Sequence, residues 1–165
     1  MTEKKPEIFL ITGEVNSGKS TYLYDIFQQY KDRSPSGIIA PGVFDNGVKT
    51  GYDVIDLATG ERKRLAVSSP PEEAYFKVGR YYFLKKSFEF AKEALTALKP
   101  DGIVFIDEIG PLELAGEGYC NCVHEIAKSG AEAAYAAVRS VCINEAVKKF
   151  FSANKVSLKT TGVDK

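Results

Sequence analysis

The sequence predicts an α/β fold: a mainly parallel sheet flanked by helices, with an antiparallel β-hairpin insertion at about residues 37–84. Three observations support this prediction. Short apolar segments alternate with amphipathic helical segments near both ends of the chain, which is typical of a parallel sheet covered on both faces. A glycine-rich segment stands between the first strand and the first helix. The middle of the chain replaces the alternation with hairpin signals and strand composition.

The first strand and the first helix are predicted from their hydrophobic patterns. Residues 7–12 are short, apolar and bounded by glycine, as in a fully buried strand. Residues 20–30 carry apolar side chains at the three- and four-residue spacing of one helix face. These side chains are Leu23, Ile26, Phe27 and Tyr30.

The middle segment has the composition of antiparallel strands. Asp45-Asn46-Gly47 is the strongest hairpin signal in the chain, and it precedes a predicted strand over 48–57. Residues 58–61 form a predicted turn into a partner strand over 62–67. We expect one further strand over 76–84 before the alternation resumes.

The later elements return to the α/β pattern. A helix with Ser87 as its N-cap is predicted before the buried strand 103–106. Residues 131–138 are ambiguous, because alanine favours a helix whereas a place between two helices favours a strand. The helix after Ser87 is predicted over 88–98, and the remaining predicted elements are helices over 117–128 and 144–151 and an edge strand over 156–158.

The segment after the first strand carries the phosphate-binding pattern G-x-x-x-x-G-K-[ST], the P-loop. Its glycines let successive backbone N–H groups point at phosphate oxygens, and the following helix adds its positive N-terminal dipole. We expect Lys19 to reach the β- and γ-phosphates and Ser20 to offer its hydroxyl to Mg²⁺. The predicted nucleotide-binding residues are Gly13, Glu14, Val15, Asn16, Ser17, Gly18, Lys19, Ser20 and Thr21.

A second motif ends the strand at 103–106. Asp107 at the strand end is expected to hold Mg²⁺ through a water, and Glu108 to activate a water for attack on the γ-phosphate. Taken alone, the pair also fits a solvated turn or a helix N-cap; beside a P-loop, a metal-supporting role is favoured. A glutamate directly after this aspartate is typical of P-loop ATPases that have an extra strand between the two motifs. The chain also lacks the Asn-Lys-x-Asp signature of guanine-specific GTPases.

The composition of the chain argues against several classes of binding partner. The formal net charge is zero, with 22 basic and 22 acidic side chains, which argues against a nucleic-acid partner. Apolar runs fall far short of the roughly 20 residues of a membrane span, and the N-terminus lacks a signal-peptide layout. We therefore expect one cytoplasmic domain over residues 1–165, with no membrane partner.

Cys120, Cys122 and His124 lack the fourth ligand of a zinc site, so no zinc is expected. The oligomeric state is not predicted.

Four segments of the chain resemble, in order and spacing, the P-loop nucleoside-triphosphatase family described from thermophiles, which has a human cancer-related member. They are the P-loop, Gly51 to Glu61, Val78 to Tyr81, and Ile106 to Leu114. The resemblance covers about residues 7–115 and fades after Leu114. It implies a RecA-like core with a β-hairpin insertion, and Mg²⁺-dependent hydrolysis of nucleoside triphosphates to diphosphates with broad base tolerance. It also implies phosphate and metal binding by Lys19 and Ser20, metal support by Asp107, and Glu108 as the base.

The sequence leaves two possible roles open for each of three charged residues. Arg80 is either a catalytic cation, acting as an arginine finger in cis, or an arginine that packs on the hairpin surface. Arg139 follows a predicted strand and either reaches the phosphates or is solvated; we favour the second. Glu113 either supports the Asp107-Glu108 motif or supplies an N-terminal charge to a helix, and again we favour the second.

Three functions therefore remain in view. The first is a Mg²⁺-dependent nucleoside-triphosphatase. The second is a small-molecule or nucleotide kinase, in which an acceptor hydroxyl replaces water and the insertion serves as a lid. The third is a slow, nucleotide-gated interaction module. Rapid hydrolysis without an acceptor distinguishes the first from the other two.

Overall fold

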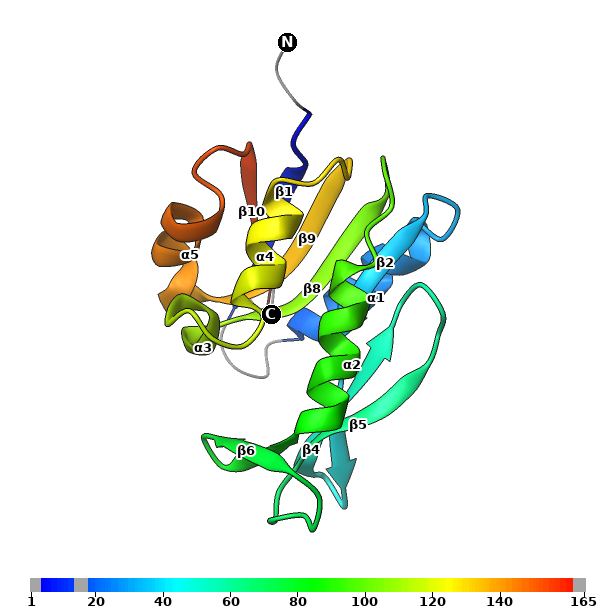
Figure 1. Cartoon of the computed structure of the whole chain (residues 1–165), viewed down its shortest axis with the longest axis vertical. Helices are drawn as coiled ribbons and strands as arrows, with labels where there is room; N and C mark the ends of the chain where they lie inside the picture. Colours follow the sequence, from blue (N-terminus) through cyan, green and yellow to red (C-terminus); the bar gives the residue numbers. More distant parts are fainter. Residues whose placement is uncertain (1–3, 14–17, 162–165) are drawn as a thin grey trace.

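The fold is built on one sheet, seen in a computed structural model that describes residues 4–13 and 18–161 (Figure 1). Its parallel part consists, in order across the sheet, of β10 (Val156–Thr160), β1 (Glu7–Gly13), β9 (Ala133–Arg139), β8 (Ile103–Ile109) and β2 (Pro35–Ile39). The antiparallel part continues from β2 with β4 (Val48–Asp56), β5 (Arg62–Val67), β7 (Tyr81–Leu84) and β6 (Tyr75–Val78), while β3 (Gly42–Asp45) pairs with β4. The predicted α/β class is thus confirmed.

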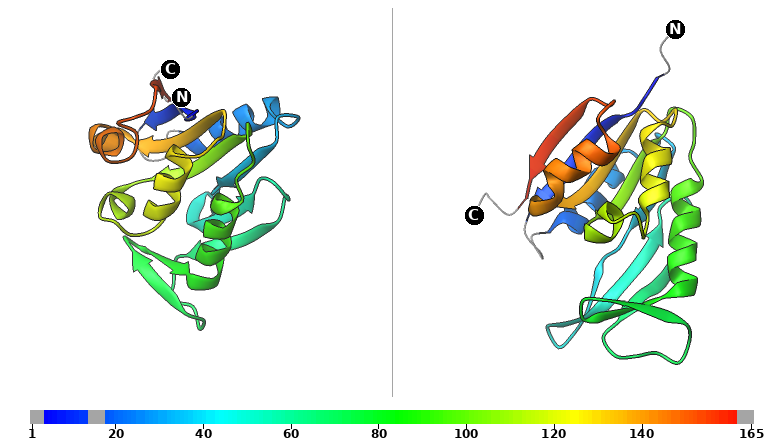
Figure 2. Two further views of the ribbon diagram at one scale, coloured as in Figure 1. Left: turned by 45° about the horizontal axis from the view of Figure 1, so that its top comes forward. Right: turned by 60° about the vertical axis from the view of Figure 1, so that its left-hand side comes forward.

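Helices cover both faces of the parallel part (Figures 1 and 2). One face packs on α1 (Lys19–Gln29), and the other packs on α2 (Lys85–Thr96), α4 (Cys120–Ala127) and α5 (Ile143–Phe150). Successive strand residues point to opposite faces, so Leu10 joins the core under α2, α4 and α5, whereas Ile11 joins the core under α1. A short helix α3 (Pro111–Leu114) follows β8, and a 3₁₀ turn spans Ser140–Cys142.

The ambiguous alanine-rich segment is strand β9. It pairs in parallel with β1 on one side and with β8 on the other. Strand β9 therefore lies between the P-loop strand and the strand that carries Asp107 and Glu108. Its position in the middle of the sheet overrides the helix propensity of its alanines, since it pairs with a strand on each side.

The insertion begins later than predicted. The first residues of the predicted range, 37–39, belong to β2, which pairs in parallel with β8 and is a core strand. Residues 76–84 are also two strands in place of one, because a turn at Gly79 and Arg80 folds β6 back on β7. The predicted hairpin at 45–47 is confirmed: Asn46 and Gly47 both have positive φ, as a type I′ turn requires.

Three helix boundaries differ from the predictions. Helix α2 begins at Lys85, so its N-cap is Leu84, and Ser87 lies buried in the first turn. The helix predicted from residue 117 begins at Cys120, with α3 before it. The helix predicted over 144–151 is α5, shifted by one residue. Within the described ranges, no helix is long and apolar enough to cross a membrane.

Candidate phosphate and catalytic site

The predicted phosphate site lies where β1 ends and α1 begins. Glu14, Val15, Asn16 and Ser17 of the P-loop lie outside the described residues. Lys19 opens α1 and is 8% exposed, and its Nζ donates a hydrogen bond to the Gly13 carbonyl at 3.1 Å. The lysine ammonium is therefore held at the end of β1, beside the first residue of the P-loop pattern.

Asp107 joins three parts of the fold at one carboxylate oxygen. Its Oδ2 accepts a hydrogen bond from Ser20 Oγ at 2.6 Å and another from the Ala40 amide at 3.0 Å. These partners come from α1 and from the segment after β2, so Asp107 fixes both against the end of β8. Thr21 is exposed on α1, next to this junction.

The junction suits a divalent cation. Asp107 is 6% exposed, and this burial raises the pKa of its carboxyl group, which the Ser20 hydroxyl, the Ala40 amide, Lys19 and Lys49 oppose. A hydroxyl and a carboxylate oxygen, adjacent and shielded, are the hard oxygen ligands that Mg²⁺ prefers. The structure thus brings together the two side chains predicted to serve the metal.

Glu108 lies between two cations at the edge of the same site. The register of β8 against β9 shifts between Asp107 and Ile109, so Glu108 lies at an irregularity of the kind that often re-aims a side chain beside an active site. Its Oε2 is 3.8 Å from Lys19 Nζ, and its Oε1 is 3.8 Å from Arg139 Nε. The side chain is 32% exposed, so it reaches both solvent and the phosphate site.

The surroundings of Glu108 favour proton uptake. Burial is the largest cause that raises the pKa of its carboxyl group, and the neighbouring Asp107 raises it further. Lys19 and Arg139 oppose this rise. A carboxylate with a raised pKa that faces water has the properties of a general base.

Arg139, for which the sequence left both a phosphate contact and a solvated position open, forms an ion pair with Glu108. It ends β9, and its guanidinium pairs with Glu108 although its side chain is 45% exposed. The available signal was topological, because a strand between β1 and β8 must end beside both motifs. Lys49 of β4 was missed altogether, although it contributes to the electrostatic environment of Asp107.

Arg80 occupies the exposed turn between β6 and β7. Its guanidinium carbon lies 5.3 Å from the centre of the Tyr81 ring. No hydrogen bond or ion pair in the described part of the chain connects it to Lys19, Asp107 or Glu108. Its catalytic role therefore stays a prediction, which Arg80→Ala tests by turnover and nucleotide affinity.

Glu113 is buried and holds the loop that follows Glu108. It is 4% exposed, and its two carboxylate oxygens accept hydrogen bonds from the amides of Gly110 at 2.9 Å and Tyr119 at 3.0 Å. Burial raises the pKa of this carboxyl group, and the two amides oppose the rise. Glu113 thus caps the first turn of α3, and it also ties α3 to the start of α4.

We expect Glu113→Ala to lower the free energy of unfolding by about 2–6 kcal/mol, since two buried N–H groups would each lose an acceptor worth about 1–3 kcal/mol. Urea unfolding measures this loss. Glu117→Ala, at an exposed position in the same loop, should change stability by no more than about 0.5 kcal/mol. Equal stability of the two variants would show that the hydrogen bonds from Gly110 and Tyr119 to Glu113 do not stabilise the fold.

Cys120, Cys122 and His124 lie on α4. Both cysteines are buried in the core, and the His124 ring packs against Phe150 with centroids 4.7 Å apart. No group of three metal-ligating side chains occurs within residues 4–13 and 18–161.

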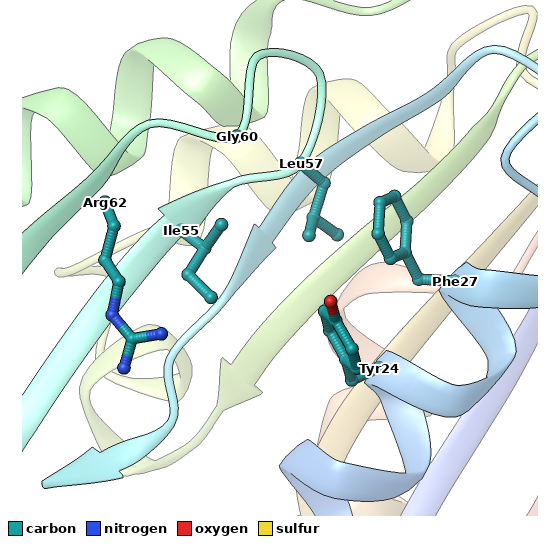
Figure 3. Close-up of a pocket in the computed structure, with 6 residues that line it drawn as sticks. All are labelled: Tyr24, Phe27, Ile55, Leu57, Gly60 and Arg62. Carbon is teal, nitrogen blue, oxygen red and sulfur yellow. The ribbon is translucent and has the colours of Figure 1, made fainter.

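A pocket of about 220 Å³ lies between α1 and the insertion (Figure 3). Its lining residues are Tyr24, Phe27, Ile55, Leu57, Gly60 and Arg62. None of them belongs to the phosphate site, and the acidic side chains of that site are absent from its lining. The pocket therefore has no place in the chemistry assigned to Asp107 and Glu108.

Known proteins resemble this chain along most of its length. A nucleoside-triphosphatase THEP1 from Methanothermobacter thermautotrophicus is 36% identical over 124 residues, covering 73% of this chain and 70% of the relative. The relative of the same name from Sulfolobus acidocaldarius is 29% identical over 146 residues, covering 87% and 83%.

Two solved structures share the fold. The crystal structure of THEP1 from the hyperthermophile Aquifex aeolicus has a TM-score of 0.74 at 22% identity, covering 95% of this chain and 91% of that one. The solution structure of a human cancer-related nucleoside triphosphatase has a TM-score of 0.65 at 20% identity, covering 97% and 89%. A family model described as NTPase matches residues 8–161, and this chain therefore belongs to the NTPase family.

Proposed function

We propose that the protein hydrolyses nucleoside triphosphates, ATP and GTP among them, to nucleoside diphosphate and phosphate in a Mg²⁺-dependent reaction. The observation that carries this proposal is the position of Glu108, between Lys19 and Arg139 and next to the Ser20–Asp107 pair. Relatives named nucleoside-triphosphatase support the reaction type.

The phosphate groups are bound at the start of α1. Lys19 exchanges its hydrogen bond with Gly13 for the β- and γ-phosphate oxygens, and the N-terminal dipole of the helix favours the negative charge. Ser20 and Asp107 are the residues that would hold Mg²⁺, which when bound neutralises charge on the β- and γ-oxygens. Most of the rate enhancement then comes from positioning and electrostatic stabilisation.

Glu108 acts as the base. It takes a proton from a water, the water oxygen bonds to the γ-phosphorus, and the bond from that phosphorus to the β–γ bridging oxygen breaks. The nucleoside diphosphate leaves with the bridging oxygen and its negative charge. Arg139 and Lys19 flank the carboxylate, so they hold it at the side of the γ-phosphate and offset its charge before the proton arrives.

Phosphate release from ATP, GTP, CTP and UTP, with Mg²⁺ and no acceptor, tests this function. We expect turnover on several nucleotides, complete loss with EDTA, and recovery when Mg²⁺ is restored, because Ser20 and Asp107 themselves carry no positive charge that could neutralise the β- and γ-phosphate oxygens. Turnover that persists with EDTA would contradict the metal requirement. Tight nucleotide binding with phosphate transfer only to an added hydroxyl compound would instead indicate a kinase.

A further inference from the structure

Strand β4 carries the insertion to the carboxyl edge of the parallel sheet. It runs antiparallel to β2, and their register pairs Ile39 with Ile55. Residues earlier in β4 therefore extend past the end of β2, beside the segment whose Ala40 amide bonds Asp107. Lys49 and Tyr52 belong to this extension.

The Lys49 side chain is held across the same segment. Gly42 lies two residues after Ala40, and a Cβ atom on it would lie 3.0 Å from Lys49 Cε and 3.6 Å from Nζ. Lys49 Nζ also lies 4.7 Å from the centre of the Tyr52 ring and donates a hydrogen bond to its hydroxyl at 3.3 Å. The Tyr52 ring in turn packs edge-on against buried Tyr81, with centroids 5.3 Å apart. The Lys49 side chain thus passes close to Gly42, which leaves room for it, and its ammonium group is oriented by the Tyr52 ring.

The segment after β2 connects Lys49 and Tyr52 to the phosphate site. Gly42 is the register partner of Tyr52 in the pairing of β3 with β4, and the Pro41 carbonyl accepts a hydrogen bond from the Asp53 amide at 3.0 Å. Ala40, the next residue toward β2, donates its amide hydrogen to Asp107 at 3.0 Å. The Lys49–Tyr52 pair is therefore fixed beside the three-residue segment that contacts the carboxylate of Asp107.

We propose that Lys49 reaches from the insertion to the γ-phosphate of a bound nucleoside triphosphate and stabilises the charge on the phosphoryl group during its transfer. This inference rests on the proposed function and extends it, because it assigns the insertion a part in the reaction. A lysine acts at such a place as a compact point charge, and it needs a neighbour to orient it. Tyr52 supplies that orientation here.

The test replaces Lys49 with methionine, which keeps the stem and removes the charge. Lys77→Met is the matched control, because Lys77 belongs to the same insertion and lies over a tyrosine ring, 5.3 Å from the centre of Tyr82. We expect Lys49→Met to lower kcat about 10²- to 10³-fold, as loss of one stabilising donor does. We expect Lys77→Met to leave kcat within about twofold, and Lys49→Arg to recover most of the loss.

Nucleotide affinity separates a γ-phosphate contact from a structural role. Lys49→Met should bind a non-hydrolysable ATP analogue more weakly while binding ADP as the wild type does. Lys49→Gln gives a second uncharged variant that keeps a donor for Tyr52, and matching thermal unfolding midpoints establish that both are folded. Equal weakening of ADP and the analogue, or unchanged kcat, would overturn the proposal. If the wild type released no phosphate, the proposed function would fail. The difference between the affinities of Lys49→Met for the ATP analogue and for ADP would still show whether Lys49 contacts the γ-phosphate.

Discussion

Glu108→Gln is expected to lower kcat for nucleoside triphosphate hydrolysis about 10²- to 10⁴-fold, the usual contribution of a positioned base. Glutamine keeps the size of the side chain and its hydrogen-bonding capacity, but it does not accept the proton of the attacking water. Nucleotide affinity should survive, because Lys19, Ser20 and Asp107 remain in place. Phosphate release and equilibrium nucleotide binding, measured on the same preparation, check both parts of this prediction.

Glu117→Gln is the control for this substitution, since Glu117 is an exposed carboxylate in the loop after α3. It should hydrolyse nucleotides at the wild-type rate. Two outcomes count against the assigned base: a Glu108→Gln enzyme that turns over normally, and one whose nucleotide binding falls as steeply as its kcat.

Gly37→Ala is expected to destabilise the fold by more than about 4 kcal/mol, the range reached by severe steric or packing defects. Gly37 lies in β2 with φ of 99°, and an added Cβ would lie 2.1 Å from the carbonyl oxygen of Phe105. Because that obstacle is backbone of the neighbouring strand, relief requires β2 to move away from β8. Such a movement would also draw Ala40 away from Asp107.

Gly47→Ala provides the comparison for this effect. Gly47 also has a positive φ, of 79°, but an added Cβ there meets no atom within 4 Å. The substitution should cost only the backbone strain, about 1–2 kcal/mol. Denaturant unfolding of both variants separates strand contact from backbone strain. Equal stabilities would show that the close approach of β2 to β8 is not what requires glycine.

Local patterns predicted much of the fold, and they failed where pairing between distant segments decides the structure. Strands β1 and β8 are recognisable because each is a continuous apolar run beside a motif. Strand β2 is five residues long and begins with Pro35, so it gives no alternation of its own. Only its pairing with β8 makes it a core strand. Contacts of this kind bring together residues far apart in the sequence and leave little local signal.

The candidate site likewise combines residues that local motifs predict with residues that only the sheet topology brings together. Lys19, Ser20, Asp107 and Glu108 were predicted because two contiguous motifs carry them. Arg139 reaches Glu108 only through the register of β9 between its neighbours, so its role is a property of the topology. The two motifs therefore carry the residues predicted to bind phosphate and metal, together with Lys19 beside Glu108, whereas Arg139 comes from a separate strand of the sheet.

The fate of the oxygen from water tests hydrolysis at the γ-phosphate directly. Wild-type protein hydrolysing ATP in ¹⁸O-labelled water, with Mg²⁺ and no other acceptor, should place one labelled oxygen in every phosphate released and none in ADP. That result requires attack by water at the γ-phosphorus. Label in ADP, or phosphate that carries no label, would contradict hydrolysis at the γ-phosphate with Glu108 as the base.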